Sequence, residues 1–391
     1  MGFTSTFGRG LIATAVAAGA LLVVPVSAAH ADPAGAPIAQ TAQAAGWHHN
    51  TGNGSVLTYW TTRSNGEAVQ ASGAFFVPEG PAPAGGWPIM AYNHGTTGLG
   101  ANCGGQSDPS TAPLAVPLKA DEELMQYFVS KGFAVVAPDH LGLGVFDTGP
   151  HPYLELRTEA TATIDMVRAA RAANPGLSRT WAVSGMSQGG HASLGASNLQ
   201  VSDAPDLDFR GTIAIDPATD VEKALPIAGP WVPELPGAIG TGVGSFSASI
   251  LAGVRAARPD AQVDSYLTDR GRQLLDDIGT ECLPAISKRM ADVSIGDLLS
   301  RPLSQGPFPG VLNDYMTVPV RGYDAPILLL VNATDTTVPS PLHGALVAQF
   351  AANGVDFDTV VGTGTHCQLN PQMWAAIDNF TARVLSTPVQ S

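Results

Sequence analysis

The arrangement of apolar and polar positions along the chain predicts a sheet of mostly parallel strands joined by helices. Short apolar runs alternate with longer segments in which apolar residues recur every three or four positions. This alternation is typical of strands connected by crossover helices. Strands are predicted at residues 72–78, 87–93, 133–138, 180–184, 209–215, 325–331 and 355–361. Helices are predicted at residues 121–131, 153–173, 342–352 and 371–385, and from residue 188 onward.

The alternation breaks between residues 218 and 322, where prolines and apolar stretches are frequent and strand-like segments nearly vanish. We interpret residues 218–322 as a mostly helical cap, or lid, inserted into an α/β core made of residues 32–217 and 323–391. An insertion between late strands would lie over the C-terminal edge of the sheet, where ligands bind in this class of fold. Within the core, residues 32–46 are rich in Ala, Gly and Pro and are expected to be loosely held.

Residues 1–31 have the pattern of a secretory signal. Arg9 provides the positive charge, residues 11–28 are apolar, and residues 29–31 form an A-x-A cleavage site. A membrane anchor is the competing interpretation, but the apolar run is short and ends in small residues. The sequence therefore predicts a secreted protein whose mature chain begins at Asp32.

Charge and cysteine content narrow the class of protein. Because the predicted signal carries only Arg9, the mature chain would have a net charge of −15, against −14 for the whole sequence. This net negative charge argues against nucleic acid or an anionic membrane as a partner. The three cysteines allow one disulfide and leave one thiol over. None of them has metal-ligand spacing, so no metal is expected.

Residues 185–189 read GMSQG, which matches the G-x-S-x-G pattern of a nucleophile elbow. The motif lies between a predicted strand and a predicted helix, as such an elbow requires. The tight turn needs small neighbours, which Gly185, Gly189 and Gly190 provide. An ordinary turn between strand and helix is the alternative interpretation. We predict Ser187 as a catalytic nucleophile.

A serine hydroxyl needs a base to accept its proton, and in this fold the histidine comes last in the chain. His366 follows the predicted strand 355–361 after a short loop, where such a histidine belongs. His343 falls within a predicted helix and is interpreted as a surface or packing residue. His366 is therefore the predicted base.

The acid of a triad follows a strand, so that it can orient the imidazole. Asp335 lies shortly after the predicted strand 325–331 and is our predicted acid. Asp216 ends the preceding strand and is the competitor, interpreted as a structural residue. Asp356 and Asp358 lie two positions apart in a strand pattern and are expected to face solvent on one side of it.

Two backbone N–H groups are needed to stabilise the oxyanion of an acyl-transfer reaction. One is expected from Gln188, the residue after the nucleophile. The other is expected from Gly95 or Thr96 in the loop HGTTG at residues 94–98, and the sequence does not choose between them. His94 is expected to pack or hydrogen-bond near this loop. The remaining nearby histidines are interpreted as supporting or surface residues: His140, His151 and His191.

Four short motifs together resemble the secretory lipase family: HGTTG at 94–98, GMSQGG at 185–190, ATDTTVP at 333–339 and THC at 365–367. The resemblance covers most of the mature chain. It implies an α/β-hydrolase fold with a cap before the acid-bearing strand, and activity on acylglycerols and other carboxylic esters. It also implies a disulfide between Cys103 and Cys282, which leaves Cys367 as a free thiol beside the histidine.

The leading hypothesis is a secreted lipase or esterase that forms an acyl-enzyme without a cofactor. Its partner is a small-molecule or lipid ester, met in solution or at a lipid–water interface, and the protein is expected to be a monomer. Apolar cap residues such as Trp231, Leu235 and Phe246 suit an acyl chain.

Two other hypotheses remain at this stage. A peptidase or an acyltransferase could use the same triad, and a peptidase that reads a free amine would need an acidic cap residue near the nucleophile. The candidates for that role are Glu222, Glu234 and Asp260. A non-catalytic binding protein on a hydrolase scaffold is the third hypothesis, and the full set of triad residues argues against it.

Overall fold

The computed structural model describes residues 1–2, 34–43, 46–112 and 115–386. The predicted signal sequence and its cleavage site lie outside the described residues, apart from residues 1–2. Among the helices that are described, none is long and apolar enough to span a bilayer.

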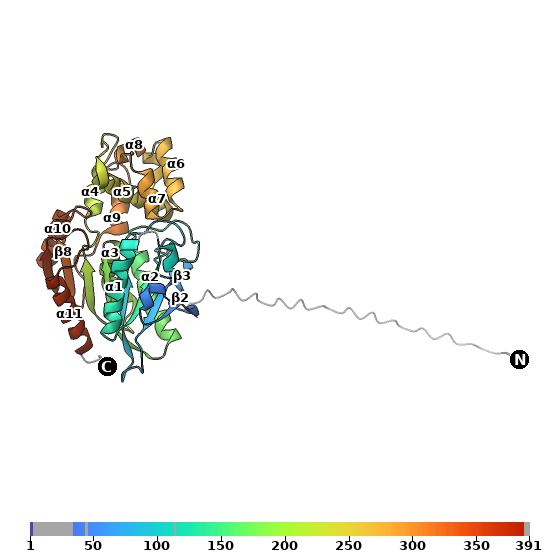
Figure 1. The fold of residues 1–391 in the computed structure, drawn as a ribbon. Helices are drawn as coiled ribbons and strands as arrows, with labels where there is room; N and C mark the ends of the chain where they lie inside the picture. Colours follow the sequence, from blue (N-terminus) through green and yellow to red (C-terminus); the bar gives the residue numbers. More distant parts are fainter. Residues whose placement is uncertain (3–33, 44–45, 113–114, 387–391) are drawn as a thin grey trace. The chain divides into compact units, whose positions relative to one another are not determined.

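A single mixed sheet of nine strands organises the described chain, in the order β1-β2-β3-β5-β4-β6-β7-β8-β9 (Figure 1). β1, β2 and β3 are antiparallel to their neighbours, whereas β4 to β9 pair in parallel. The strands are β1 Pro37–Ala42, β2 Asn53–Thr62, β3 Ala68–Val77, β4 Trp87–Asn93, β5 Ala134–Pro138, β6 Leu177–Met186, β7 Asp208–Ile215, β8 Ile327–Asn332 and β9 Phe357–Gly362. The predicted mainly parallel sheet is therefore present, and every predicted strand has a counterpart.

Helices cover both faces of the sheet (Figure 1). On one face α1 and α11 pack against alternate residues of the central strands. On the other face α2, α3 and α10 pack against the remaining residues of those strands. These helices are α1 Ala115–Ser130, α2 Leu156–Ala173, α3 Gln188–Asp203, α10 Ser340–Ala352 and α11 Pro371–Ser386. The central parallel strands are buried from both sides, which explains why they read as continuous apolar runs.

The prediction that residues 32–46 are loosely held is wrong for the part that the structure describes. Residues 37–42 form the edge strand β1, which pairs with β2. All six side chains of β1 are exposed, so no alternation of apolar and polar residues marks the strand in the sequence. β2 itself was not predicted, although its alternating burial is typical of a half-buried strand.

Between β7 and β8 the chain forms helices and contributes no strand to the sheet. These helices pack around an apolar core of their own, which includes the buried side chains of Leu251, Tyr266, Leu298 and Phe308. They are α4 Val221–Ala224, α5 Gly237–Ala257, α6 Asp269–Ile278, α7 Leu283–Arg289, α8 Ile295–Leu298 and α9 Phe308–Met316, with short 3-10 turns at Leu225–Ile227, Pro259–Ala261 and Val263–Tyr266. This segment has the helical character expected of the predicted cap 218–322, and we use that name for it.

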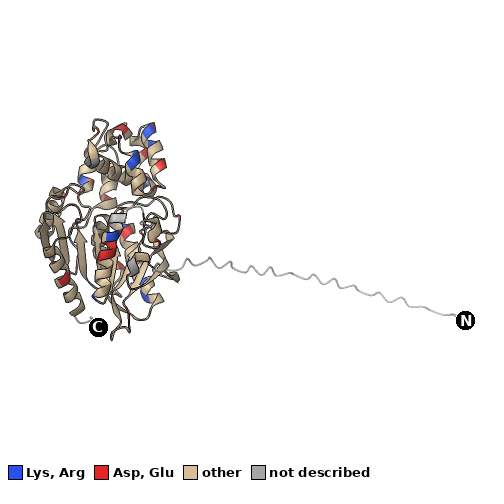
Figure 2. Cartoon of the chain, viewed as in Figure 1, with Lys and Arg blue, Asp and Glu red and all other residues tan. Residues whose placement is uncertain are grey.

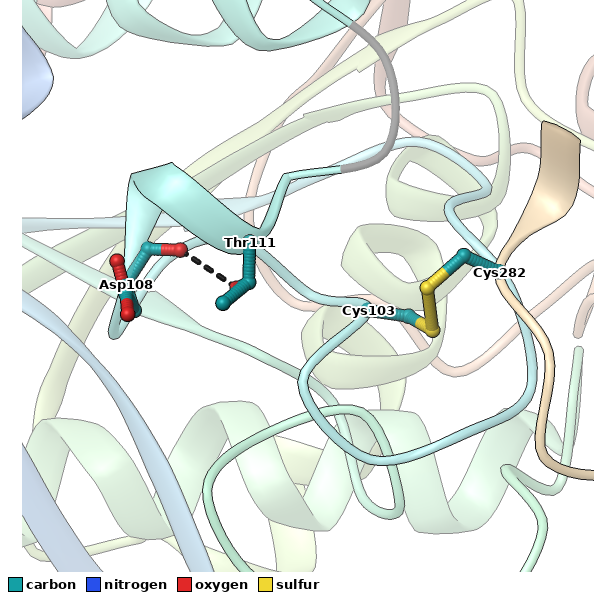
Figure 3. The surroundings of a disulfide bond; sticks show 4 residues. All are labelled: Cys103, Asp108, Thr111 and Cys282. Atoms are coloured by element: carbon teal, nitrogen blue, oxygen red, sulfur yellow. Dashed lines mark hydrogen bonds between the residues drawn. A yellow bond between two sulfur atoms is a disulfide. The ribbon is translucent and has the colours of Figure 1, made fainter.

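The cap is fastened to the loop that follows β4. A disulfide joins Cys103 of this loop to Cys282 of the cap (Figure 3), at a sequence separation of 179. Beside the disulfide, the N–H of Leu283 donates a 2.7 Å hydrogen bond to the carbonyl oxygen of Thr97. The pairing that the family resemblance implied is present, and Cys367 is a free cysteine.

Removing the disulfide should destabilise the protein without changing its fold. We expect the double variant Cys103→Ser/Cys282→Ser to lose about 2–5 kcal/mol of unfolding free energy, because a cross-link that closes a long loop restricts the unfolded chain. Denaturant unfolding measures the change. Reductant should shift the wild-type transition to that of the double variant and should leave the double variant unaffected. A wild-type transition that does not respond to reductant would contradict this prediction.

Candidate active site

Ser187 occupies a strained turn between β6 and α3. Its φ of 56° and ψ of −119° lie far from the values of ordinary strands and helices. The turn is held by the N–H of Ser187, which donates to the carbonyl oxygen of Ile215 at 2.9 Å. The Ser187 carbonyl oxygen in turn accepts from the N–H groups of His191 and Ala218. This strain is characteristic of a nucleophile elbow, where the hydroxyl is presented above the end of the sheet.

The elbow packs so closely against β4 that two of its positions tolerate only glycine. A Cβ atom on Gly189 would lie 1.9 Å from the carbonyl oxygen of Asn93, and one on Gly185 would lie 2.3 Å from the carbonyl oxygen of Gly189. Both contacts are with backbone atoms, which cannot move aside like a flexible side chain. The sequence requirement for small residues around the predicted nucleophile thus has a direct steric cause.

Asp335 and His366 form a hydrogen-bonded pair. The Nδ1 of His366 lies 2.5 Å from Oδ2 of Asp335, whose side chain is fully buried. The other carboxylate oxygen, Oδ1, accepts the N–H groups of Thr337 at 2.8 Å and Val338 at 3.2 Å. These two donors fix the carboxylate, so the imidazole is held with Nδ1 toward the acid.

The loop that carries His366 lies next to the elbow, because the thiol of Cys367 is close to the backbone N–H of Ser187. The Nε2 of His366 is buried and has no hydrogen-bond partner among the described residues, Ser187 included. In enzymes without substrate, catalytic hydrogen bonds are often long and shorten only in the complex. An unpaired Nε2 is compatible with the predicted role of His366 as a base.

Cys367 is unsuited to be a nucleophile itself. Burial raises the pKa of its thiol well above the ordinary value, and the carboxylates of Asp216, Asp335 and Asp121 add to the effect. A thiol that stays protonated is a weak nucleophile.

Asp216 does not contact the imidazole as the triad acid would. Its carboxylate, fully buried at the end of β7, accepts N–H groups from Asn332 and from the backbone of Cys367. His343, on α10, is also buried, with Nε2 bonded to the carbonyl oxygen of Pro217 and Nδ1 3.8 Å from Asp216. Burial lowers the pKa of His343 below its ordinary value, although nearby carboxylates oppose the shift. Asp216 thus bridges two loops as a hydrogen-bond acceptor, and His343 is a packing residue of the interior.

Two groups of side chains are close enough to hold a metal ion, within the part of the chain that the structure describes. One is Asp216 with His366 and Cys367, and the other is Asp216 with Asp335 and His343. However, both oxygens of Asp216 already accept N–H donors, and Nδ1 of His366 is bonded to Asp335. Donor hydrogens that point at these oxygens would repel a cation, so both groups fit hydrogen bonding better than metal ligation.

The predicted oxyanion loop lies beside the elbow. A Cβ atom on Gly95 would lie 3.8 Å from the Cβ of Ser187, so the loop backbone reaches the nucleophile. The hydroxyl of Thr96 is bonded to the Tyr153 hydroxyl at 2.8 Å. Gln188 is the first residue of α3, where an N–H has no partner within the helix. The N–H groups of Gln188 and of Gly95 or Thr96 remain the predicted donors.

A buried polar network lies beneath the elbow and was only partly anticipated. The side-chain amide of Gln188 donates to Glu159 at 2.7 Å and contacts Nε2 of His151 at 2.6 Å. Glu159 also bonds Nδ1 of His191 at 3.0 Å. Burial lowers the pKa of His151 to about 4, so its ring is neutral and can accept a hydrogen bond from Gln188. His140, stacked on His151, is also buried, so none of these histidines is a surface residue.

Glu159 is the member of this network that the sequence did not reveal. α2 is buried at nearly every position from residue 158 to residue 170, so no polar face distinguishes an acidic residue that points inward. His94 behaves as predicted and hydrogen-bonds near its loop, to the carbonyl oxygens of Gly95 and Asp139.

A cavity of about 430 Å³ opens beside Ser187, between the acid loop and the cap. Its cap walls come from α4, the turn after it and α5, and the core contributes Tyr153, Val338 and Leu342. The cavity-lining residues include no charged side chain, and the acidic cap residues Glu222, Glu234 and Asp260 are not among them. The cavity is therefore apolar and suited to a hydrocarbon chain.

Sequence comparison confirms the resemblance that the motifs suggested. The family described as "Secretory lipase" matches residues 109–301, which include the elbow and most of the cap. A protein of Mycobacterium tuberculosis named as a probable inactive lipase is 26% identical over 255 residues. That match covers 63% of this chain and spans 53% of the length of the relative. Asp335 and His366 lie outside the family match.

Solved structures show the same fold over nearly the whole chain. Candida antarctica lipase A in its closed state matches with a TM-score of 0.71 and 21% identity, covering 92% of this chain and 84% of that one. A rice cell wall degrading esterase from Xanthomonas oryzae matches with a TM-score of 0.68 and 21% identity, covering 90% and 97%. At this identity the comparison shows the fold alone, and the predicted α/β-hydrolase fold is confirmed.

Because a Cβ atom on Gly189 would clash with the Asn93 backbone, Gly189→Ala is expected to abolish activity and lower stability. The added methyl group must displace the Asn93 backbone, and strain of this kind costs about 1–3 kcal/mol. Gly344→Ala on α10 is the matched control, because a Cβ there meets no atom within 4 Å. The control should unfold at or slightly above the wild-type temperature. If Gly189→Ala unfolds at the wild-type temperature and hydrolyses esters at the wild-type rate, the contact with Asn93 is not restrictive.

Proposed function

We propose that this chain, a relative of the secretory lipases, is an exported serine hydrolase that cleaves carboxylic esters of the acylglycerol type. The observation that carries the proposal is the position of Ser187, which lines an uncharged apolar cavity beside the hydrogen-bonded pair of Asp335 and His366. The cavity accounts for binding an acyl chain, and the pair supplies the base. The disulfide, together with the predicted signal sequence, fits export to an oxidising compartment.

The reaction proceeds through an acyl-enzyme. Oγ of Ser187 attacks the ester carbonyl while Nε2 of His366 takes the hydroxyl proton, and Asp335 stabilises the resulting imidazolium. The carbonyl oxygen becomes an oxyanion, which accepts hydrogen bonds from the N–H of Gln188 and from the loop at Gly95 or Thr96. The C–O bond to the alcohol then breaks, and the alcohol leaves with the proton from His366. A water molecule repeats the steps and releases the fatty acid.

The surface around the cavity suits a lipid–water interface. Four large apolar side chains of the cap are exposed between residues 227 and 243, namely Ile227, Trp231, Leu235 and Val243. Three of them also line the cavity, so the apolar surface continues into the cavity. Glu234 is the one charged residue in the sequence of this segment, whereas charged residues of both signs gather on α6 and α7 (Figure 2), where Arg289, for example, pairs with Asp277 and Glu281. An exposed apolar patch next to an apolar cavity favours substrates presented at a lipid surface.

The proposed nucleophile is tested with p-nitrophenyl esters of increasing acyl length. Wild-type protein should hydrolyse them, and Ser187→Ala should lose at least about 10³-fold in kcat, as loss of a triad nucleophile does. Ser197→Ala, a buried serine of the same helix, is the control and should keep wild-type turnover. A folded Ser187→Ala protein that retains activity would remove the basis for the proposal, as would a wild-type protein that neither turns over esters nor reacts with a fluorophosphonate probe.

The interface is tested with Leu235→Ser, because Leu235 is exposed but does not line the cavity. Removing its apolar surface should lower the rate on emulsified triglyceride by roughly fivefold, corresponding to about 1 kcal/mol of lost adsorption. The rate on a dissolved short-chain ester should stay unchanged. Val361→Ser, which removes a still more exposed apolar side chain from β9, should affect neither rate. Equal effects of Leu235→Ser and Val361→Ser on the emulsion would rule out a specific interface at the cap.

A further inference from the structure

Asp216 makes three hydrogen bonds that connect the loops carrying the acid and the base. Its Oδ1 accepts the backbone N–H of Asn332 at 2.7 Å, and its Oδ2 accepts the side-chain amide of Asn332 at 2.8 Å. Oδ2 also accepts the backbone N–H of Cys367 at 2.7 Å, directly after His366. One buried carboxylate therefore holds the end of β8 and the histidine loop together.

Asn332 extends this connection in both directions. Its carbonyl oxygen accepts the N–H of Asp335 at 3.1 Å, at the start of the acid loop. Its side chain accepts the N–H of Gly364 at 2.9 Å and donates to the carbonyl oxygen of Gln368 at 3.1 Å, so both ends of the histidine loop are fixed. Asp216 itself is anchored to the sheet, because its N–H donates to Leu330 of β8 at 2.8 Å.

Asp216 also lies close to both members of the hydrogen-bonded pair. Its carboxylate lies within 4.8 Å of His366 and Cys367, and within 4.8 Å of Asp335 and His343. A change at Asp216 is therefore expected to move the acid and the base relative to each other.

We propose that Asp216 is a positioning residue of the triad, whose carboxylate sets the spacing of Asp335 and His366 through its three hydrogen bonds. This inference rests on the proposed ester hydrolysis. It assigns Asp216 a role in the reaction without contact with the substrate. Transfer of the serine proton requires the imidazole of His366 within hydrogen-bond reach of Ser187, so a displaced histidine loop would slow the reaction.

The test compares Asp216→Asn with Asp208→Asn on p-nitrophenyl butyrate. Asp208 lies at the opposite end of the same strand, is also buried, and pairs with Arg210 and Thr180. Asp216→Asn should lower kcat by about 10- to 100-fold, as small misplacements of catalytic groups do, with KM changed less than about threefold. Asp208→Asn should lose stability and leave kcat and KM unchanged.

A second variant tests the same connection at its other end. Asn332→Ala keeps the carboxylate of Asp216 and removes the side chain that fixes the histidine loop, so kcat should fall while KM changes little. If Asp216→Asn does not fold, a folded Asn332→Ala with wild-type kcat overturns the proposal. A folded Asp216→Asn whose kcat matches wild type also overturns it.

Proton NMR gives a readout that does not depend on turnover. The Nδ1 proton of His366 in its bond to Asp335 should give a low-field resonance in wild type, and Asp335→Asn should abolish it. Asp216→Asn should shift or broaden this resonance, whereas Asp208→Asn should leave it unchanged. A resonance unaffected by Asp216→Asn overturns the inference. A protein that shows these spectral changes but hydrolyses no ester instead refutes the proposed function.

Discussion

The close approach of the elbow to the end of β4 is the constraint on which the rest of the site depends. With no side chains at Gly185 and Gly189, the backbone of α3 lies against the carbonyl of Asn93. This contact fixes the distance between Ser187 and the loop that follows β4. That loop carries the predicted oxyanion donors, so the geometry of attack and the geometry of charge stabilisation are set by one backbone contact. A strained serine conformation is tolerated because the surrounding sheet holds both sides of it.

The same loop is also the attachment point of the cap. Thr97 bonds to Leu283, and a few residues later Cys103 is linked to Cys282. The cap therefore does not rest on the core as an independent lid at this edge. Its α7 end is tied to the oxyanion loop, whereas its apolar segment from residue 227 to residue 243 has exposed side chains around the cavity. The side next to α7 is therefore held to the core, whereas the side next to the cavity is exposed.

The sequence predicted the fold and the candidate triad because both follow from local patterns. Central parallel strands are continuous apolar runs, and each proposed triad residue comes shortly after one of them. The edge strand β1 was missed because all its side chains are exposed. Glu159 was missed because α2 is buried on nearly all sides, and a buried acid is understandable only from its partners Gln188 and His191, which are distant in sequence.

The hydrogen bonds between loops are the part of the site that only the structure supplies. Ser187, Asp335 and His366 follow different strands, and the sheet ladder ends before each of them. Beyond that point buried polar side chains that bridge the loops add to individual backbone hydrogen bonds in setting their spacing. Asp216 and Asn332 are two such bridging side chains. A relative can keep the fold and the elbow while losing such bridges, so a shared family does not by itself guarantee a working triad.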